Sequence, residues 1–257
     1  MPAEHGGWGL TLEPGILGVL LAPSIAGVLL GVAALLAFLL RTPARLILLR
    51  RLRSGERMPT EAAQARQRLA MQVALVELLA IGLALAGAAV LAEDPDWIWP
   101  LVLAMPMFVI ATFFDLRSES RHLVPQIVGS VAVAAVAAMG TLAGGGSGAL
   151  AIGAWLILSA RVFSSIPHVR DQIRRIHRRD VVPRSGVIGD LAAIWTAAMA
   201  VLLESSLALG AAAIVGLVVV QRVTLAQPPR PARALGVRQM ILGFSVVGVT
   251  TAGVWLS

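Results

Sequence analysis

Five ionisable residues interrupt the long apolar runs of this chain: Glu13, Glu77, Asp115, Arg161 and Asp190. A charged side chain within a membrane-spanning helix is unfavourable, so such residues mark functional sites or form structural pairs. In the second interpretation, Glu77 and Asp190 pair with Arg161 or with arginines at the membrane surface. Because the predicted topology places all five toward the same side of the membrane, the set favours a polar cavity that opens to the cytoplasm.

The first residues of the chain, EHGGWG from Glu4 to Gly9, form a second candidate site. Histidine transfers protons near neutral pH, and a carboxylate can accept them. Glycines allow a ligand or another helix to approach the backbone closely. We therefore predict that Glu4, His5 and Glu77 are the catalytic, proton-handling residues. The alternative is an ordinary helix start in which Trp8 anchors the chain at the membrane interface.

A third candidate lies between Ile166 and Arg179, where isoleucine and valine recur at helical spacing and arginines occupy the other faces. This pattern predicts an amphipathic helix lying in the membrane interface. The helix either rests on anionic lipid headgroups or caps a cavity, with its guanidinium groups directed at a phosphate or carboxylate. Across the chain, the predicted substrate-binding residues are Arg50, Asp115, Arg121, Arg161, Arg170, Asp171 and Arg174.

The composition excludes an ordinary water-soluble protein, since 58% of the residues are hydrophobic and only 14% are charged. All 21 basic residues are arginines, and they lie between apolar runs, which argues for membrane topology and against nucleic-acid binding. Cysteine is absent, and no nucleotide-binding, zinc-protease or serine-hydrolase motif occurs. We expect neither a metal nor a cofactor, and membrane lipids are the expected surroundings.

These residues need membrane-spanning helices to position them, and a helix requires about 20 apolar residues to cross a bilayer. Residues 9–40 would reach about 48 Å as one helix, too far for a hydrocarbon core of about 30 Å. Pro14 and Pro23 interrupt this stretch, so we predict two short helices that meet near Ala22 to Ser24. Seven further apolar runs cover residues 70–92, 97–114, 123–143, 149–166, 187–204, 205–220 and 239–256.

The prediction is therefore an all-α integral membrane protein, with about nine short helices in a single domain over residues 1–257, or eight if the first two are one. Arginines occur at alternate ends of these spans, in segments 41–69, 115–122, 161–186 and 221–238. Positive residues beside membrane spans remain in the cytoplasm, so we place these segments there. Two initial helices also place the N-terminus inside; one long helix would place it outside. The sequence gives no oligomeric state.

Three patches resemble the YwiC-like family of bacterial membrane proteins. They are EHGGWG at the N-terminus, FDLRSESRH after the fourth span, and FSSIPHVRDQIRR after the sixth, in which Val169, Arg170, Ile173 and Arg174 match the V-R-x-x-I-R pattern of that family. The resemblance implies a multi-pass protein of the bacterial inner membrane.

A more distant likeness is to the UbiA-type prenyltransferases, which have nine helices and active-site loops after the second and sixth. The basic segments 41–69 and 161–186 occupy these two places, and Arg50, Leu52 and Gly55 match the R-P-L-x-x-G stretch of that superfamily. Those enzymes hold Mg²⁺ and diphosphate with two aspartate-rich motifs. Here residues 14–55 contain no Asp or Glu, and the second position retains only Asp171. The likeness therefore implies direct binding of phosphate by arginines.

Three functions remain open. The first is a UbiA-like protein that binds or modifies an anionic lipid or isoprenoid substrate, with enzyme activity undecided. The second is a transporter of a small solute or anion, with Glu13, Glu77 and Arg161 on its pathway. The third is a non-catalytic assembly protein that holds partners with its basic face.

Overall fold

The computed structural model describes residues 5–52, 61–117, 122–178, 180, 183–228 and 230–257. Over these residues the chain forms helices and no strand, which confirms the all-α prediction. The helices are α1 (His5–Leu21), α2 (Ile25–Leu52), α3 (Glu61–Leu91), α4 (Ile98–Leu116), α5 (Leu123–Ala143), α6 (Gly148–Ile176), α7 (Pro183–Leu203), α8 (Ala208–Leu225) and α9 (Ala232–Leu256). Two short 3₁₀ turns, η1 (Pro95–Trp97) and η2 (Ser205–Leu207), precede α4 and α8.

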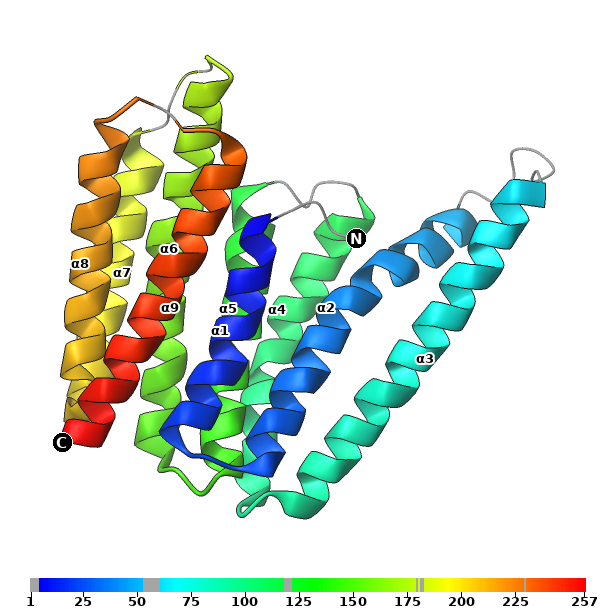
Figure 1. The fold of residues 1–257 in the computed structure, drawn as a ribbon, viewed down its shortest axis with the longest axis horizontal. Coiled ribbons are helices and arrows are strands. Elements are labelled where there is room, and N and C mark those ends of the chain that lie inside the picture. The colour runs from blue at the N-terminus through cyan, green and yellow to red at the C-terminus, as the bar shows by residue number, and fades with distance from the viewer. Residues whose placement is uncertain (1–4, 53–60, 118–121, 179, 181–182, 229) are drawn as a thin grey trace.

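Eight of these described helices, α2 to α9, are long and apolar enough to cross a membrane. The remaining one, α1, has 17 residues, corresponding to a length of about 25 Å. It packs against α2, α5 and α9 within the bundle (Figure 1). The protein is thus a multi-pass membrane protein whose shortest described α-helix has four neighbouring helices as packing partners, since α1 also contacts α6.

The predicted division of residues 9–40 is confirmed. Helix α1 ends at Leu21, the chain leaves helical geometry at Ala22, Pro23 and Ser24, and α2 begins at Ile25. Ser24 Oγ accepts a hydrogen bond from the backbone N–H of Gly27, which caps the new helix. The other proline, Pro14, lies inside α1 without ending it.

Successive helices run in opposite directions, so the two ends of the bundle differ in charge (Figure 1). The described arginines other than Arg161 lie toward the end where α1 begins, which we call the arginine-bearing end. The opposite end carries the acidic and neutral connections between α3 and α4, α5 and α6, and α7 and α8. Arg161 is the exception within the described chain, because it lies midway along α6.

The prediction of a separate interfacial helix at Ile166 to Arg179 is wrong. Helix α6 continues without a break to Ile176, with Pro167 inside it. Ile173, expected on the buried face, is 40% exposed, whereas Asp171 and Gln172 are buried. The polar face turns inward because its side chains contact α7, α8 and α9.

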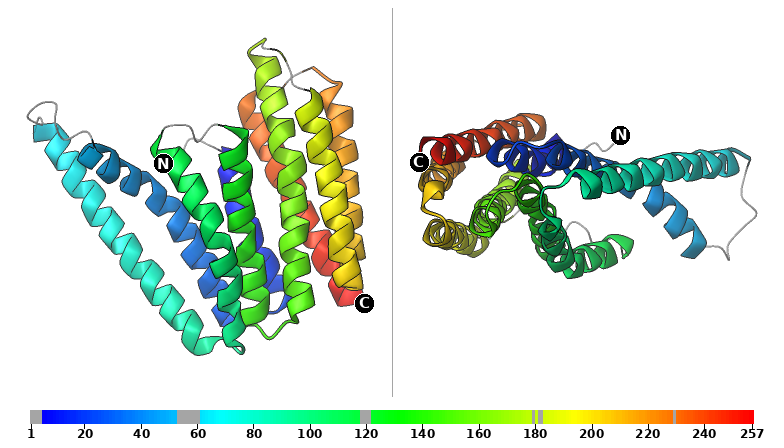
Figure 2. Two further views of the ribbon diagram at one scale, coloured as in Figure 1. Left: turned by 180° about the vertical axis from the view of Figure 1, so that it is seen from behind. Right: turned by 90° about the horizontal axis from the view of Figure 1, so that it is seen from below.

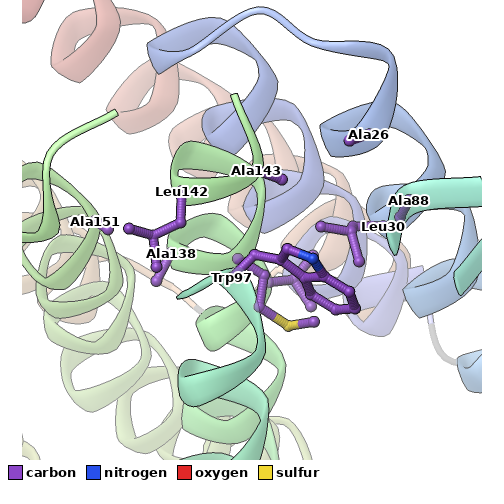
Figure 3. Close-up of a cluster of buried hydrophobic side chains, with 10 residues drawn as sticks. Ala26, Leu30, Ala88, Trp97, Ala138, Leu142, Ala143 and Ala151 are labelled. Atoms are coloured by element: carbon purple, nitrogen blue, oxygen red, sulfur yellow. The ribbon is translucent and has the colours of Figure 1, made fainter. Parts of the chain in front are cut away.

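The apolar core follows α5 and α6, the most buried of the long helices. In one cluster, the indole of Trp97 on η1 packs beside Leu30 of α2 and Leu142 of α5, with small alanines from α2, α3, α5 and α6 around it (Figure 3). Helix α3 packs chiefly along α2, and these two helices form an arm at one side of the molecule (Figure 2). The remaining helices therefore form the body in which a site can be enclosed.

Candidate functional site

A buried ion pair lies near the middle of the bundle. Arg161 Nη2 on α6 is 2.8 Å from Glu13 Oε1 on α1, and the two side chains are only 3% and 1% exposed. Arg161 Nη2 also donates to the backbone carbonyl of Gln239 on α9, at 2.9 Å. The pair thus joins three helices that are far apart in the sequence.

Space for this pair depends on Gly243 of α9. A Cβ atom at this position would overlap both Glu13 Oε1 and Arg161 Nη2. Gly9, one turn before Glu13 on α1, is also close, since a Cβ there would lie 3.0 Å from Glu13 Oε1. The absence of side chains at these positions allows the carboxylate and guanidinium to meet between α1 and α9.

The Glu13 contact does not satisfy the guanidinium of Arg161. Its Nε and Nη1 atoms are buried and have no hydrogen-bond partner among the described residues. Nε2 of Gln239 and Nε2 of His168 are in the same condition. Unpaired polar atoms are unfavourable in an apolar bundle, and where several of them gather they indicate a site for a polar ligand or water.

Arg161 begins a row of polar side chains along one face of α6, which we call the polar stripe. Its members recur every three or four residues, the spacing that places side chains on one face of a helix. They are Arg161, Ser164, Ser165, His168, Asp171, Gln172 and Arg175. All except Arg175 are buried, so the stripe connects the middle of the bundle with the arginine-bearing end through the protein interior.

Helices α7 and α8 complete the centre of the stripe. Ser164 Oγ is 2.8 Å from Asp190 Oδ1 and 2.7 Å from Gln221 Oε1, and Gln221 Nε2 donates to Ser165 Oγ at 3.0 Å. Asp190 in turn pairs with Arg222, whose side chain is 39% exposed. These contacts form a continuous polar connection from the interior to a half-exposed arginine.

The part of the stripe nearest the arginine-bearing end forms hydrogen bonds with the C-terminal end of α8 and the residues that follow it. Gln172 Nε2 donates to the carbonyl of Thr224 at 3.2 Å, while its Oε1 is buried and unpaired among the described residues. Arg175 donates to the carbonyls of Leu225 and Gln227. Since these bonds satisfy carbonyls at the end of a helix, they explain why the polar side of α6 faces inward.

The predicted ligands on this part of α6 contact different partners. Arg170 Nη1 donates to Gln126 Oε1 of α5 at 3.1 Å, and Arg174 Nη1 donates to the carbonyl of Asp180 at 3.4 Å. Asp171 is buried on the side of α7, where its Oδ2 lies 3.3 Å from the position of a Cβ on Gly186. Only Asp171 of these three residues therefore belongs to the polar stripe.

Two other predicted residues lie away from the Glu13–Arg161 pair. Asp115 of α4 accepts a hydrogen bond from Arg41 of α2, at 2.9 Å. Glu77 is half-buried on α3, and its Oε2 has no hydrogen-bond partner in the described part of the chain. Because α3 packs chiefly against α2, the structure does not bring Glu77 to Arg161. The pairing of Asp190 with an arginine is confirmed, whereas the pairing of Glu77 with Arg161 is wrong.

The N-terminal candidates are only partly covered. Glu4 and Arg121 lie outside the described residues, and so do the side chains of His5 and Arg50, which belong to α1 and α2. Their roles stay predictions. Trp8 is described: its ring lies edge-on against Phe38 of α2, with centroids 5.6 Å apart, so it packs between helices.

Six polar residues of the site were missed in the sequence: Ser164, Ser165, His168, Gln172, Gln221 and Gln239. On α6, the polar residues that recur every three or four positions after Arg161 could have predicted a buried polar face. The arginines of the same segment led instead to the prediction that the isoleucine face is buried. Gln221 and Gln239 give no periodic signal. Each is a single amide near the end of an apolar run.

Within the described residues, no three His, Asp or Glu side chains gather closely enough to hold a metal ion. The site is therefore built from guanidinium, amide, hydroxyl and imidazole groups, together with carboxylates of which Glu13 and Asp190 are paired with arginines. Such groups bind polar or anionic ligands through hydrogen bonds.

Comparison with known proteins places the chain in a family. No curated protein and no solved structure matches it. The family model described as YwiC-like protein matches residues 1–143, more than half of the chain, which includes Glu13 and helices α1 to α5. The chain is therefore a member of the YwiC-like protein family.

Proposed function

We propose that this membrane protein binds an anionic lipid or isoprenoid substrate, whose headgroup enters the polar stripe of α6 from the arginine-bearing end. One observation carries the proposal: buried polar atoms without partners among the described residues occur at three positions along the stripe, Arg161, His168 and Gln172. By the rule that positive residues remain inside, this end faces the cytoplasm of a bacterial inner membrane.

The available groups support binding through arginine and amide donors. Guanidinium groups form strong hydrogen bonds with phosphate and carboxylate oxygens. Glu13 and Asp190 are engaged with arginines, so neither is offered to a divalent cation. This agrees with direct binding of the anionic group, as expected from the missing aspartate-rich motifs. Kinship with the UbiA-type enzymes stays a prediction, and we propose binding without assigning a reaction.

Transport of a small solute or anion is the second candidate function. The position of the Glu13–Arg161 pair favours it, because ionisable residues deep within membrane-spanning helices commonly line the paths of ions and solutes. Polar contacts lead from this pair through Gln239 and Gln221 to Ser164, and on through Asp190 to Arg222. They would form the half of such a path nearest the arginine-bearing end.

Lipid analysis of the purified protein tests the first proposal. We expect mass spectrometry to find an anionic lipid or isoprenoid enriched over its level in the source membrane. The double variant Glu13→Leu/Arg161→Met removes the central donors without leaving one buried charge alone, and we expect it to lose this enrichment. Arg41→Ala, in an ion pair outside the stripe, is the control and should retain the lipid.

The alternatives give different results. Lipid content equal to that of the source membrane in the wild-type protein contradicts the lipid proposal. Solute or anion flux into proteoliposomes that the Glu13→Leu/Arg161→Met variant abolishes would instead support the transporter.

A further inference from the structure

A shallow groove lies on the outside of the bundle where α9 begins. Its volume is about 720 Å³. Three arginines and five apolar residues line it: Arg230, Arg233 and Arg238, with Pro231, Ala234, Val237, Ile241 and Leu242. We call it the α9 groove.

The two kinds of side chain occupy different levels of the α9 groove. Arg230 and Arg233 lie at the arginine-bearing end, beside the first turn of α9. Val237 and Ile241 follow one and two turns further into the span, and they are 42% and 60% exposed. A positive rim above an apolar wall matches an amphiphile with an anionic headgroup and a hydrocarbon chain.

The charge around the α9 groove is of one sign. From Gln227 to Ser257 the sequence contains no Asp or Glu, and no acidic residue lines the groove. Pro231, which precedes α9, provides no side-chain cap, so the free backbone N–H groups of the first turn add to the positive potential at this level. The complementary occupant is therefore an anion.

A small depression lies between the α9 groove and the end of the polar stripe. It shares Arg230 and Arg238 with the groove and extends to Gln172 of α6 and Thr224 of α8. Gln172 is the stripe residue whose Oε1 is buried without a partner in the described chain. The groove thus lies on the outside of the bundle, beside the end of the stripe nearest the arginine-bearing end.

We propose that the α9 groove binds an anionic phospholipid taken laterally from the bilayer, with its phosphate against Arg230, Arg233 and Arg238 and an acyl chain along Val237 and Ile241. This inference takes its class of ligand, an anionic lipid, from the proposed function. It adds the site at which that lipid passes from the bilayer to the protein. Free phosphate lacks the chain that the apolar wall accommodates, so it should bind more weakly.

The test is native mass spectrometry of the detergent-solubilised full chain titrated with phosphatidylglycerol, phosphatidylcholine or inorganic phosphate. We expect the wild-type protein to prefer phosphatidylglycerol. The triple variant Arg230→Gln/Arg233→Gln/Arg238→Gln should weaken this binding by about tenfold or more, since it removes three charge-assisted contacts. Ile241→Trp, which fills the apolar wall without changing charge, should weaken it too.

A matched control removes the same charge elsewhere at this end. Arg66, Arg68 and Arg184 are exposed on α3 and α7, away from the groove, and their combined replacement by glutamine should leave binding of phosphatidylglycerol unchanged. If both triple variants lose the same affinity for phosphatidylglycerol, the loss is a general effect of charge, and the lipid site in the α9 groove is contradicted. If inorganic phosphate binds as tightly as phosphatidylglycerol, a phospholipid is not the specific ligand of the α9 groove.

The outcomes also separate this inference from the proposed function. Suppose that the wild-type protein prefers phosphatidylglycerol and that the groove variants bind it equally well. The assignment of a lipid site to the α9 groove is then contradicted, while the proposal of lipid binding at the polar stripe is retained. If the wild-type protein shows no preference and carries no enriched lipid, both proposals fail.

Discussion

Two arginine–carboxylate pairs connect distant helices of this protein, and they lie in opposite environments. The Glu13–Arg161 pair joins α1 and α6 with both side chains almost fully buried. The Arg41–Asp115 pair joins α2 and α4 at the arginine-bearing end, where the side chain of Arg41 is 53% exposed.

The closest N···O distances, 2.8 Å and 2.9 Å, are nearly the same. The surroundings of each pair determine how unfavourable the remaining charge is when one partner is removed. A buried charge without its partner loses both solvation and attraction, whereas an exposed charge regains contact with solvent. Burial, rather than interatomic distance, therefore distinguishes the arginine of the interior site from the arginine exposed at the surface. Four substitutions test this difference.

The largest effect is expected from Arg161→Ala. It leaves the carboxylate of Glu13 alone in the bundle, so we expect the free energy of unfolding to fall by about 3–5 kcal/mol. Denaturant unfolding in detergent micelles measures this loss. The Glu13→Leu/Arg161→Met variant should recover most of it, because apolar replacements leave no buried charge. A loss below about 1 kcal/mol for Arg161→Ala, the range of exposed pairs, would remove the distinction.

Gly243→Ala should have the next largest effect. The added methyl group overlaps the Glu13–Arg161 contact, and overpacking of this kind costs about 1–3 kcal/mol. Gly248 on the same helix is the matched control, because a Cβ there meets no atom within 4 Å. Gly248→Ala should stabilise the helix slightly. If the two variants unfold alike in the same assay, the close approach at Gly243 is not a constraint.

Ser164→Ala sharpens the comparison within the polar stripe. The hydroxyl is shared between Asp190 and Gln221, and its loss should reduce the free energy of unfolding by about 0.6–1.7 kcal/mol, as for other hydrogen bonds between membrane helices. Ser245→Ala is its control, since Ser245 is exposed and, within the described part of the chain, bonds to a carbonyl of its own helix alone. Equal stability of the two variants would argue against an energetic role for the Ser164 connection.

The smallest effect is expected from Arg41→Ala. A pair with a half-exposed arginine contributes about 0.2–1 kcal/mol, and salt screens it. Unfolding measured at low and high salt should show a difference from the wild-type protein that shrinks as salt rises. If Arg41→Ala lowers the free energy of unfolding as much as Arg161→Ala does, and independently of salt, then burial does not distinguish the two pairs.

The sequence predicted the features that depend on local composition. The division at Pro23 follows from the excess length of one apolar run, and the charge of the two bundle ends follows from the arginine segments. Both need only a single stretch of chain and the thickness of a bilayer. This is why the number and direction of the helices could be predicted without any tertiary contact.

Features that depend on partners were not accessible in this way. The rotation of α6 about its axis was assigned from Ile173 and the arginines, but bonds from Gln172 and Arg175 to the end of α8 turn the other face inward. The choice of Glu13 over Glu77 as the partner of Arg161 also depends on which helices pack together. Both acids looked equivalent as charges within apolar runs, and only the position of α3 in the outer arm separates them.

The glycine contact at the centre of the bundle has a consequence for biogenesis. Helix α1 is synthesised before α6 and α9 and carries Glu13, yet the guanidinium and the glycine that accommodate this carboxylate belong to those two later helices. The membrane insertion machinery must therefore shelter α1, or leave it at the surface, until α9 has been synthesised. The surroundings of Glu13 are therefore complete only when α9 has packed against α1, and a chain truncated before α9 should expose α1 to quality-control proteases.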